Sequence, residues 1–115
     1  MLLLFLKAKM TIKLMNNMNV LIIAEPHFND YDAFSKRVSS LLSKDSVNTI
    51  SGQHEMVKRF TEEKHGFFVD SMKDPDKVII FWDNKYEPVR EEMNKWLKRG
   101  KHVSLTNTAR DYWRD

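Results

Sequence analysis

The sequence predicts an α/β protein: a small three-layer Rossmann-like fold with a parallel sheet of four or five strands and helices on both faces. Two apolar runs, residues 20–24 and Lys77–Trp82, have the continuous hydrophobicity of strands that are covered on both faces. Segments with helical spacing of apolar residues follow each run, and this alternation is typical of parallel sheets. The 115 residues suffice for one small domain with one core.

The first strand, at residues 20–24, leads through a turn into a helix at 31–43. Asp30 precedes this helix and is expected to be its N-cap, because its carboxylate can accept a hydrogen bond from a first-turn N–H. A second short strand is expected at 47–50, and a helix that ends near Gly66 follows it. The predicted inner faces of the two helices are Phe34, Val38, Leu41 and Leu42, and then Met56, Val57 and Phe60.

Residues 67–72 allow two interpretations, a short third strand or a helical turn. The run Lys77–Trp82 is the strongest strand signal in the chain. Asn84 is expected to cap the next helix, in which Pro88 suits the first turn. A last short strand is expected at 102–105. The predicted inner face of the helix before it consists of Val89, Met93, Trp96 and Leu97.

The net charge of +3 is concentrated near the N-terminus. Residues 1–18 contain three of the 19 basic residues and none of the 16 acidic ones. The remainder of the chain therefore has 16 basic and 16 acidic residues and no net charge. A nucleic-acid partner is therefore not expected for the body of the protein. Residues 1–18 are either an N-terminal arm, which could include an edge strand at 10–14, or an over-extended start. Their apolar run is too short to span a bilayer, so no membrane partner is expected.

The chain contains no cysteine, which excludes a disulfide framework, a thiolate metal site and a cysteine nucleophile. His54-Glu55 lacks the second histidine of a zinc helix motif, and the four histidines show no ligand spacing. We therefore expect no metal and no cofactor. A cytoplasmic location fits the absence of cysteine. Residues 19–105 are expected to form the domain, and 106–115 a C-terminal cap or tail.

Three blocks of sequence carry a family resemblance. The first strand ends in Ala24-Glu25-Pro26, which is followed by His27-Phe28-Asn29-Asp30-Tyr31. Ser51-Gly52 follows the second strand, and Phe81-Trp82-Asp83-Asn84 ends the strongest one. In this order, over residues 19–105, the chain resembles the YspA-like branch of the SLOG superfamily, Rossmann-like proteins related to the LOG phosphoribohydrolases and DprA. The family segment before the Phe-Trp-Asp strand is longer, so loss of the third strand would leave four strands.

The family's phosphate-binding positions differ in this chain. Glu25 stands where the family has a glycine and places negative charge where an anion would sit. Pro26 stands in place of an arginine and removes a backbone donor, and Met56 replaces a further glycine. Ser51-Gly52 could still present N–H groups at a helix N-terminus, or could be a turn glycine with a capping serine. The resemblance therefore implies a nucleotide-type pocket whose binding motifs are degenerate.

The candidate ligand-binding residues lie on the loops after three strands: Glu25, His27, Ser51, Gly52, Gln53, Trp82, Asp83 and Tyr86. Trp82 could stack on a base or fill the space of the missing segment, and Asp83 could contact a ribose hydroxyl or begin a loop. Glu91 aligns with the acid of the catalytic relatives. Acids in the first turns of a helix, such as Glu91 and Glu92, are also favoured by the helix dipole alone.

The resemblance and the degenerate motifs together predict a non-catalytic SLOG-like domain that binds a nucleotide-derived small molecule or a protein partner. One alternative is a LOG-like nucleotide phosphoribohydrolase with Glu91 as its catalytic acid. Another is a ligand-free protein that forms homo-oligomers. The small size and the richness in Lys, Asn and Met would suit a phage or mobile-element protein.

Overall fold

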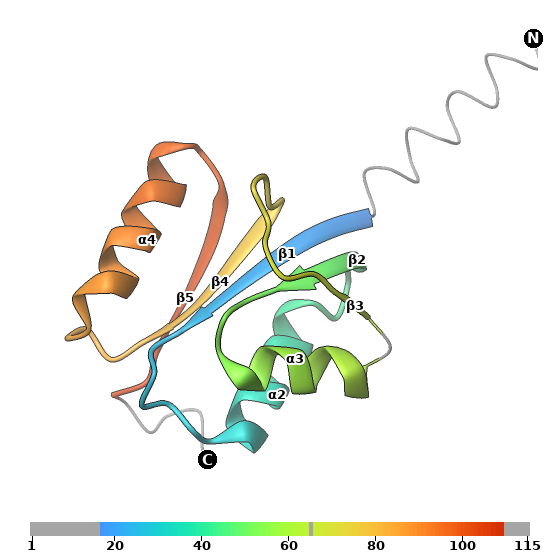
Figure 1. Cartoon of the computed structure of the whole chain (residues 1–115), viewed down its shortest axis with the longest axis horizontal. Helices are drawn as coiled ribbons and strands as arrows, with labels where there is room; N and C mark the ends of the chain where they lie inside the picture. Colours follow the sequence, from blue (N-terminus) through green and yellow to red (C-terminus); the bar gives the residue numbers. More distant parts are fainter. Residues whose placement is uncertain (1–16, 65, 110–115) are drawn as a thin grey trace, which may run out of the picture.

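The computed structural model describes residues 17–64 and 66–109. Its described strands form one sheet in the order β3-β2-β1-β4-β5, in which every neighbouring pair is parallel. Helices α2 and α3 cover one face of the sheet, and α4 covers the other (Figure 1). The predicted three-layer Rossmann-like α/β fold is confirmed. The elements are β1 (Asn17–Ala24), α2 (Tyr31–Leu41), β2 (Ser46–Ser51), α3 (Glu55–Glu63), β3 (Phe67–Phe68), β4 (Lys77–Trp82), α4 (Glu87–Lys98) and β5 (His102–Asn107).

The strand order places β1 at the centre of the sheet, between β2 and β4. The chain winds from β1 outward to β2 and β3, and then returns to the other side of β1 to form β4 and β5. In open parallel sheets, ligands bind beyond the carboxyl ends of the strands where the winding reverses in this way. The loops after β1 and β4 lie at that point of this sheet.

The core between the sheet and helices α2 and α3 is aromatic. Phe34 of α2 is fully buried, and its ring centroid lies 5.0 Å from that of Phe81 and 6.1 Å from that of Phe60. The ring of Phe28, from the loop after β1, stacks on Phe81 at 5.3 Å. The predicted inner faces of the two helices are confirmed, with Leu41 only half-buried against the core.

A second core lies between the sheet and α4. It contains Val78, Ile80 and Trp82 of β4 together with Val89 and Trp96 of α4. Three of the four residues predicted for the inner face of α4 pack here: Val89, Met93 and Trp96. The fourth, Leu97, is 52% exposed, so that prediction is wrong. Leu97 follows Trp96 by one residue, which turns it about 100° away from the sheet.

The third strand is present, so the four-strand alternative is wrong. β3 has only two residues, and Phe67 pairs with Thr49 of β2. The segment 69–76 between β3 and β4 contains no helix. A parallel sheet normally has helices on both faces. On the α4 side, no helix of the described residues covers the half of the sheet formed by β1 and β2, and Leu21 and Ile23 of β1 are only half-buried.

The helix ends differ in part from the expectations. Asp30 caps α2 as predicted, because its carboxylate accepts from Ala33 N at 3.1 Å. Asn84 does not cap α4, which begins after Tyr86. Asn84 instead has φ +67°, a left-handed conformation that asparagine tolerates better than most residues. The end of α4 follows the glycine rule, since Gly100 has φ +73° and donates to Leu97 O at 3.0 Å.

Three strands are longer than expected, and β2 exceeds its expected range by one residue at each end. β1 begins at Asn17, and β5 continues to Asn107. The additional stretch of strand in β5 includes the buried Thr106, whose hydroxyl accepts from Arg37 Nε of α2 at 3.0 Å. Residues 1–16, with the proposed edge strand at 10–14, and residues 110–115 lie outside the described residues. No helix within the described part has the length and apolar character needed to cross a bilayer.

A polar cluster joins α2 to α3. The Tyr31 hydroxyl donates to Glu63 Oε1 at 2.6 Å, and Arg59 Nε donates to Glu63 Oε2 at 3.2 Å. The Arg59 guanidinium lies 3.7 Å from the centroid of the Tyr31 ring. Burial, followed by the hydrogen bond and charge of Glu63, raises the pKa of Tyr31 from 10.0 to about 12.

We expect Glu63→Gln to lower the pKa of Tyr31 toward 10, because the substitution removes the negative charge beside the phenol. The folded state raises this pKa, so the protonated Tyr31 phenol stabilises the folded protein. This contribution to the free energy of unfolding is fully present below about pH 10 and is lost as the pH rises through about 12. Absorbance at 295 nm during an alkaline titration measures the phenolate. Glu62→Gln, at the exposed neighbouring position, is the control, and an equal effect of both variants would contradict the assignment.

Candidate functional site

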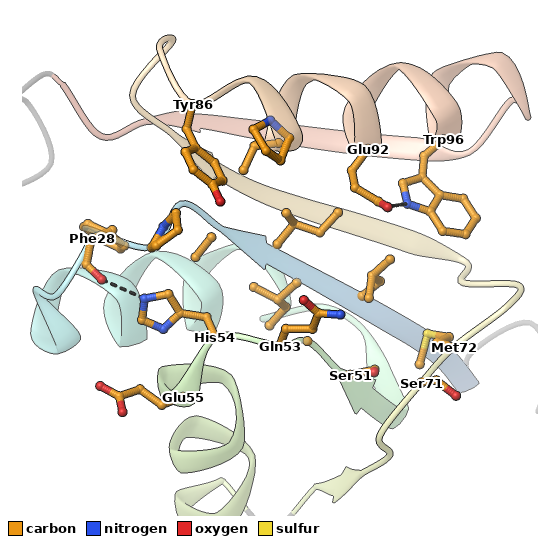
Figure 2. Close-up of a pocket in the computed structure, with 18 of the residues that line it drawn as sticks. Phe28, Ser51, Gln53, His54, Glu55, Ser71, Met72, Tyr86, Glu92 and Trp96 are labelled. Carbon is orange, nitrogen blue, oxygen red and sulfur yellow. Dashed lines mark hydrogen bonds between the residues drawn. The ribbon is translucent and has the colours of Figure 1, made fainter.

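A cleft of about 720 Å³ extends from the carboxyl ends of β1 and β2 along the sheet face beside α4 (Figure 2). Its apolar floor includes Leu21 and Ile23 of β1. The turn 51–55, the loop 70–72 and the inner side of α4 surround this floor. The cleft occupies the half of this sheet face that has no helix, and it reaches the point where the winding of the sheet reverses.

The loop after β1 uses its own polar groups. Glu25 is only 3% exposed and does not line the cleft. Its carboxylate Oε2 accepts from His27 N at 3.1 Å, its backbone N–H donates to Phe81 O, and its backbone carbonyl accepts from Phe28 N. His27 is exposed and also lies outside the lining. The backbone donors of this turn are thus bonded within the protein, and Pro26 has none.

The turn after β2 lies directly on the cleft, which Ser51, Gly52 and Gln53 line. The Ser51 side chain is buried, and no hydrogen bond within the described residues uses its hydroxyl. Gly52 does not have a positive φ. A Cβ atom at position 52 would lie 2.4 Å from Ile22 O, so this glycine permits close approach of two backbones.

His54, which the sequence interpretation left without a role, caps α3. Its Nδ1 accepts from Met56 N at 3.2 Å, and its Nε2 lies 2.8 Å from Phe28 O, as Figure 2 shows. Since Nδ1 accepts a hydrogen bond, Nε2 carries the ring proton and donates to the carbonyl. The neutral imidazole therefore ties the N-terminus of α3 to the loop after β1. Its place immediately before the first helical residue is the signal that could have identified it, although the expected cap was Ser51.

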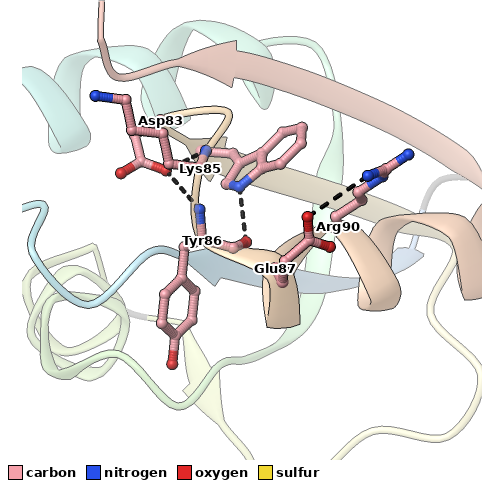
Figure 3. A network of polar contacts seen from close by, with 6 residues as sticks. Asp83, Lys85, Tyr86, Glu87 and Arg90 are labelled. Atoms are coloured by element: carbon pink, nitrogen blue, oxygen red, sulfur yellow. Dashed lines mark hydrogen bonds and ion pairs between the residues drawn. The ribbon is translucent and has the colours of Figure 1, made fainter.

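The turn after β4 is also closed by internal hydrogen bonds (Figure 3). Asp83 Oδ1 accepts from Lys85 N at 2.9 Å and from Tyr86 N at 3.0 Å. The bond from Lys85, with that from Tyr86, holds the pKa of Asp83 below its usual value. Trp82 is buried outside the cleft lining, and its Nε1 donates to Tyr86 O at 2.8 Å. The Tyr86 ring projects into the cleft and is 37% exposed (Figure 2).

The two adjacent glutamates of α4 face different surroundings. Glu91 is exposed and lies outside the cleft, on a shallow surface with Asn94 and Lys98. Glu92 lines the cleft, and its Oε2 accepts from Trp96 Nε1 at 3.1 Å. Adjacent residues of a helix point about 100° apart. The sequence resemblance alone does not show which of the two glutamates points into the cleft.

The ionisable side chains of the cleft are mostly acidic. Glu55, Asp70 and Glu92 line it, and among the described residues Lys95 contributes the one ammonium group. Lys95 Nζ lies 4.7 Å from the centroid of the Trp96 ring. Within residues 17–64 and 66–109, no group of three or more metal-ligating side chains occurs. Comparison with protein-family models, with curated proteins and with solved structures gives no match to this chain.

Proposed function

We propose that this protein is a non-catalytic binding domain, a degenerate member of the SLOG superfamily, whose cleft holds a nucleotide-derived small molecule. The observation that carries the proposal is the position of the cleft. It is lined by residues of the loops after β1 and β4, Pro26 and Tyr86 among them, and the winding of the parallel sheet reverses between these two strands. Open α/β sheets bind ligands at such a point.

The dimensions and lining of the cleft suit a ligand with a flat ring. About 720 Å³ lies within the range of small-molecule sites. Leu21 and Ile23 supply an apolar surface, and Tyr86 supplies an aromatic ring at the open side. Polar side chains, Ser51 and Glu92 among them, line the cleft beside this apolar surface and are available to orient a ligand.

The location of Glu91 supports a binding role without catalysis. This carboxylate, which the resemblance places in the catalytic position, lies outside the cleft. A catalytic acid must reach the reacting atoms within hydrogen-bond distance or through one water molecule. Glu92 does line the cleft, but its carboxylate is bonded to Trp96 Nε1. We therefore assign both residues no catalytic step.

A thermal-shift screen with nucleosides, nucleotides and cyclic nucleotides tests the proposal. A compound that binds only the folded state raises the melting temperature, and at 100 times its dissociation constant it adds about 2.7 kcal/mol of stability. We expect at least one compound to do so. Absence of a shift throughout the panel would contradict the proposal.

We expect Tyr86→Ala to weaken binding of the active compound about tenfold, because stacking of a base on an aromatic side chain contributes about 1–3 kcal/mol. The backbone N–H and carbonyl of Tyr86, which bond Asp83 and Trp82, remain in this variant. His27→Ala, an exposed position outside the cleft, is the control. Titration calorimetry measures both, and equal affinities of the two variants would place the ligand elsewhere.

A protein partner, including a second copy of this chain, is the second candidate. Three large apolar side chains in the described residues are markedly exposed: Phe67 at 73%, Leu97 at 52% and Leu105 at 43%. Phe67 lies on the edge strand β3 and Leu105 on the opposite edge strand β5, and an exposed edge strand can pair with another chain. Light scattering over a range of concentrations tests self-association directly, and a monomer at every concentration would count against a second copy.

A further inference from the structure

We infer that the ligand of the cleft carries no phosphate and presents hydrogen-bond donors to the protein, as a nucleoside or a free base does. This inference rests on the proposed function and specifies the chemistry of its ligand. Two independent sets of contacts support it. The first concerns the backbone donors at the strand ends, and the second concerns the acceptors that face the cleft.

Four backbone donors that could hold a phosphate are already bonded to side chains of the protein. Rossmann-like folds bind phosphate with N–H groups of the loops and helix N-termini at the strand ends. In the three corresponding loops here, Glu25 accepts from His27 N, His54 accepts from Met56 N, and Asp83 accepts from Lys85 N and Tyr86 N. Side chains of the protein thus occupy the places that an anion would take.

The charges near these loops also disfavour an anion. Glu25 is a buried carboxylate beside the end of β1, and Glu55 and Glu87 lie in the first turns of α3 and α4. A carboxylate in the first turn neutralises the positive end of the helix dipole, which otherwise attracts phosphate. Among the described residues, three carboxylates and one ammonium group line the cleft. A monophosphate would therefore enter a site with the same sign of charge.

Two side chains of the cleft are placed to accept hydrogen bonds from a ligand. The Ser51 residue is 2% exposed and lines the cleft, and its hydroxyl has no hydrogen-bond partner within the described residues. Because this residue borders the cleft, a ligand or water in the cleft can supply the partner. Glu92 is held by the bond from Trp96 Nε1 to its Oε2, which leaves its other oxygen able to accept. Figure 2 shows both residues facing the interior of the cleft.

Titration calorimetry of the full chain with four nucleosides, each paired with its 5′-monophosphate, tests the inference. Adenosine, guanosine, cytidine and uridine present different donors, while each pair differs only in the phosphate. We expect at least one nucleoside to bind about tenfold or more tightly than its monophosphate, because of the like charges in the cleft.

Three variants locate the contacts. Glu92→Gln keeps an oxygen acceptor for Trp96 Nε1 and removes the charge, so it should weaken the nucleoside about tenfold and reduce the preference over the monophosphate. Ser51→Ala should weaken binding about fivefold through loss of a neutral hydrogen bond. Glu62→Gln, an exposed position on α3 outside the cleft, should leave the affinity unchanged. Thermal melts of the unliganded variants verify that each one folds.

The outcomes separate this inference from the proposed function. If monophosphates bind and nucleosides do not, the inference about phosphate is overturned while the proposed function stands. If neither class binds, the inference is overturned, and the proposed function is overturned as well only if the rest of the thermal-shift panel, including the cyclic nucleotides, also fails to bind. If a nucleoside binds preferentially but Glu92→Gln and Ser51→Ala bind it as the unmodified chain does, the two acceptors are wrongly assigned and the inference about the donors fails.

Discussion

Phe34→Ala is expected to lower the free energy of unfolding by about 3–5 kcal/mol, the usual range for a buried phenylalanine. Phe34 is fully buried, and its ring contacts those of Phe81, Phe60 and Phe28, from a strand, a helix and a loop. Its removal therefore leaves a cavity where α2, α3 and the sheet meet. Urea denaturation measures the loss, and the melting temperature should fall by about 15 °C or more.

Phe67→Ala is the matched control, since it deletes the same atoms at a position that is 73% exposed. Its effect on the free energy of unfolding should stay within about 0.5 kcal/mol. A loss at Phe67 as large as that at Phe34 would contradict the placement of the core between α2, α3 and the sheet. The two variants together therefore test the packing of the fold with one type of substitution.

The sequence predicted most of the fold because its hydrophobic patterns are unambiguous. The continuous apolar run Lys77–Trp82 is buried at every position from Val78 to Trp82, as expected for a parallel strand with a neighbour on each side. Phe34, Val38 and Leu42 recur at intervals of four residues, and all three are buried. Patterns of this kind depend on the residues themselves, so they can be read without a structure.

The elements that the sequence left open depend on specific contacts that no hydrophobic pattern reveals. β3 is two residues long and exists because Phe67 and Phe68 pair with β2. The start of α4 is set by Asp83, whose carboxylate bonds the next turn and leaves Asn84 in a left-handed conformation. Neither the pairing nor the turn is determined by local propensity.

The sequence predicted which loops form the candidate site, but it did not predict which of their side chains point into the cleft. Topology alone places the loops after β1, β2 and β4 near one another. Of the residues proposed there, Ser51, Gly52, Gln53 and Tyr86 line the cleft, whereas Trp82 is buried outside its lining. The directions of Glu91 and Glu92 differ by one helical step. Such orientations follow from how α4 packs on the sheet, which no motif encodes.

Gly52→Ala is expected to lower the free energy of unfolding by about 3 kcal/mol, at the upper end of overpacking effects. The added Cβ would lie 2.4 Å from the backbone oxygen of Ile22 and 2.8 Å from Cγ2 of Val57. The backbone atom cannot move aside alone, so β1 and α3 must separate around the turn. Thermal and urea denaturation measure the effect, and the melting temperature should fall by about 12 °C or more.

Gly100→Ala is the comparison, because it changes a glycine of a different kind. Gly100 has φ +73° and no atom within 4 Å of an added Cβ, so its substitution introduces only backbone strain of about 1–2 kcal/mol. A glycine needed only for contact with a ligand would behave otherwise, since its substitution would abolish binding and leave the unfolding free energy unchanged. That result at Gly52 would contradict its role in packing. A large loss of stability would mean instead that this glycine is retained because β1 and α3 approach each other at that point, whatever the cleft binds.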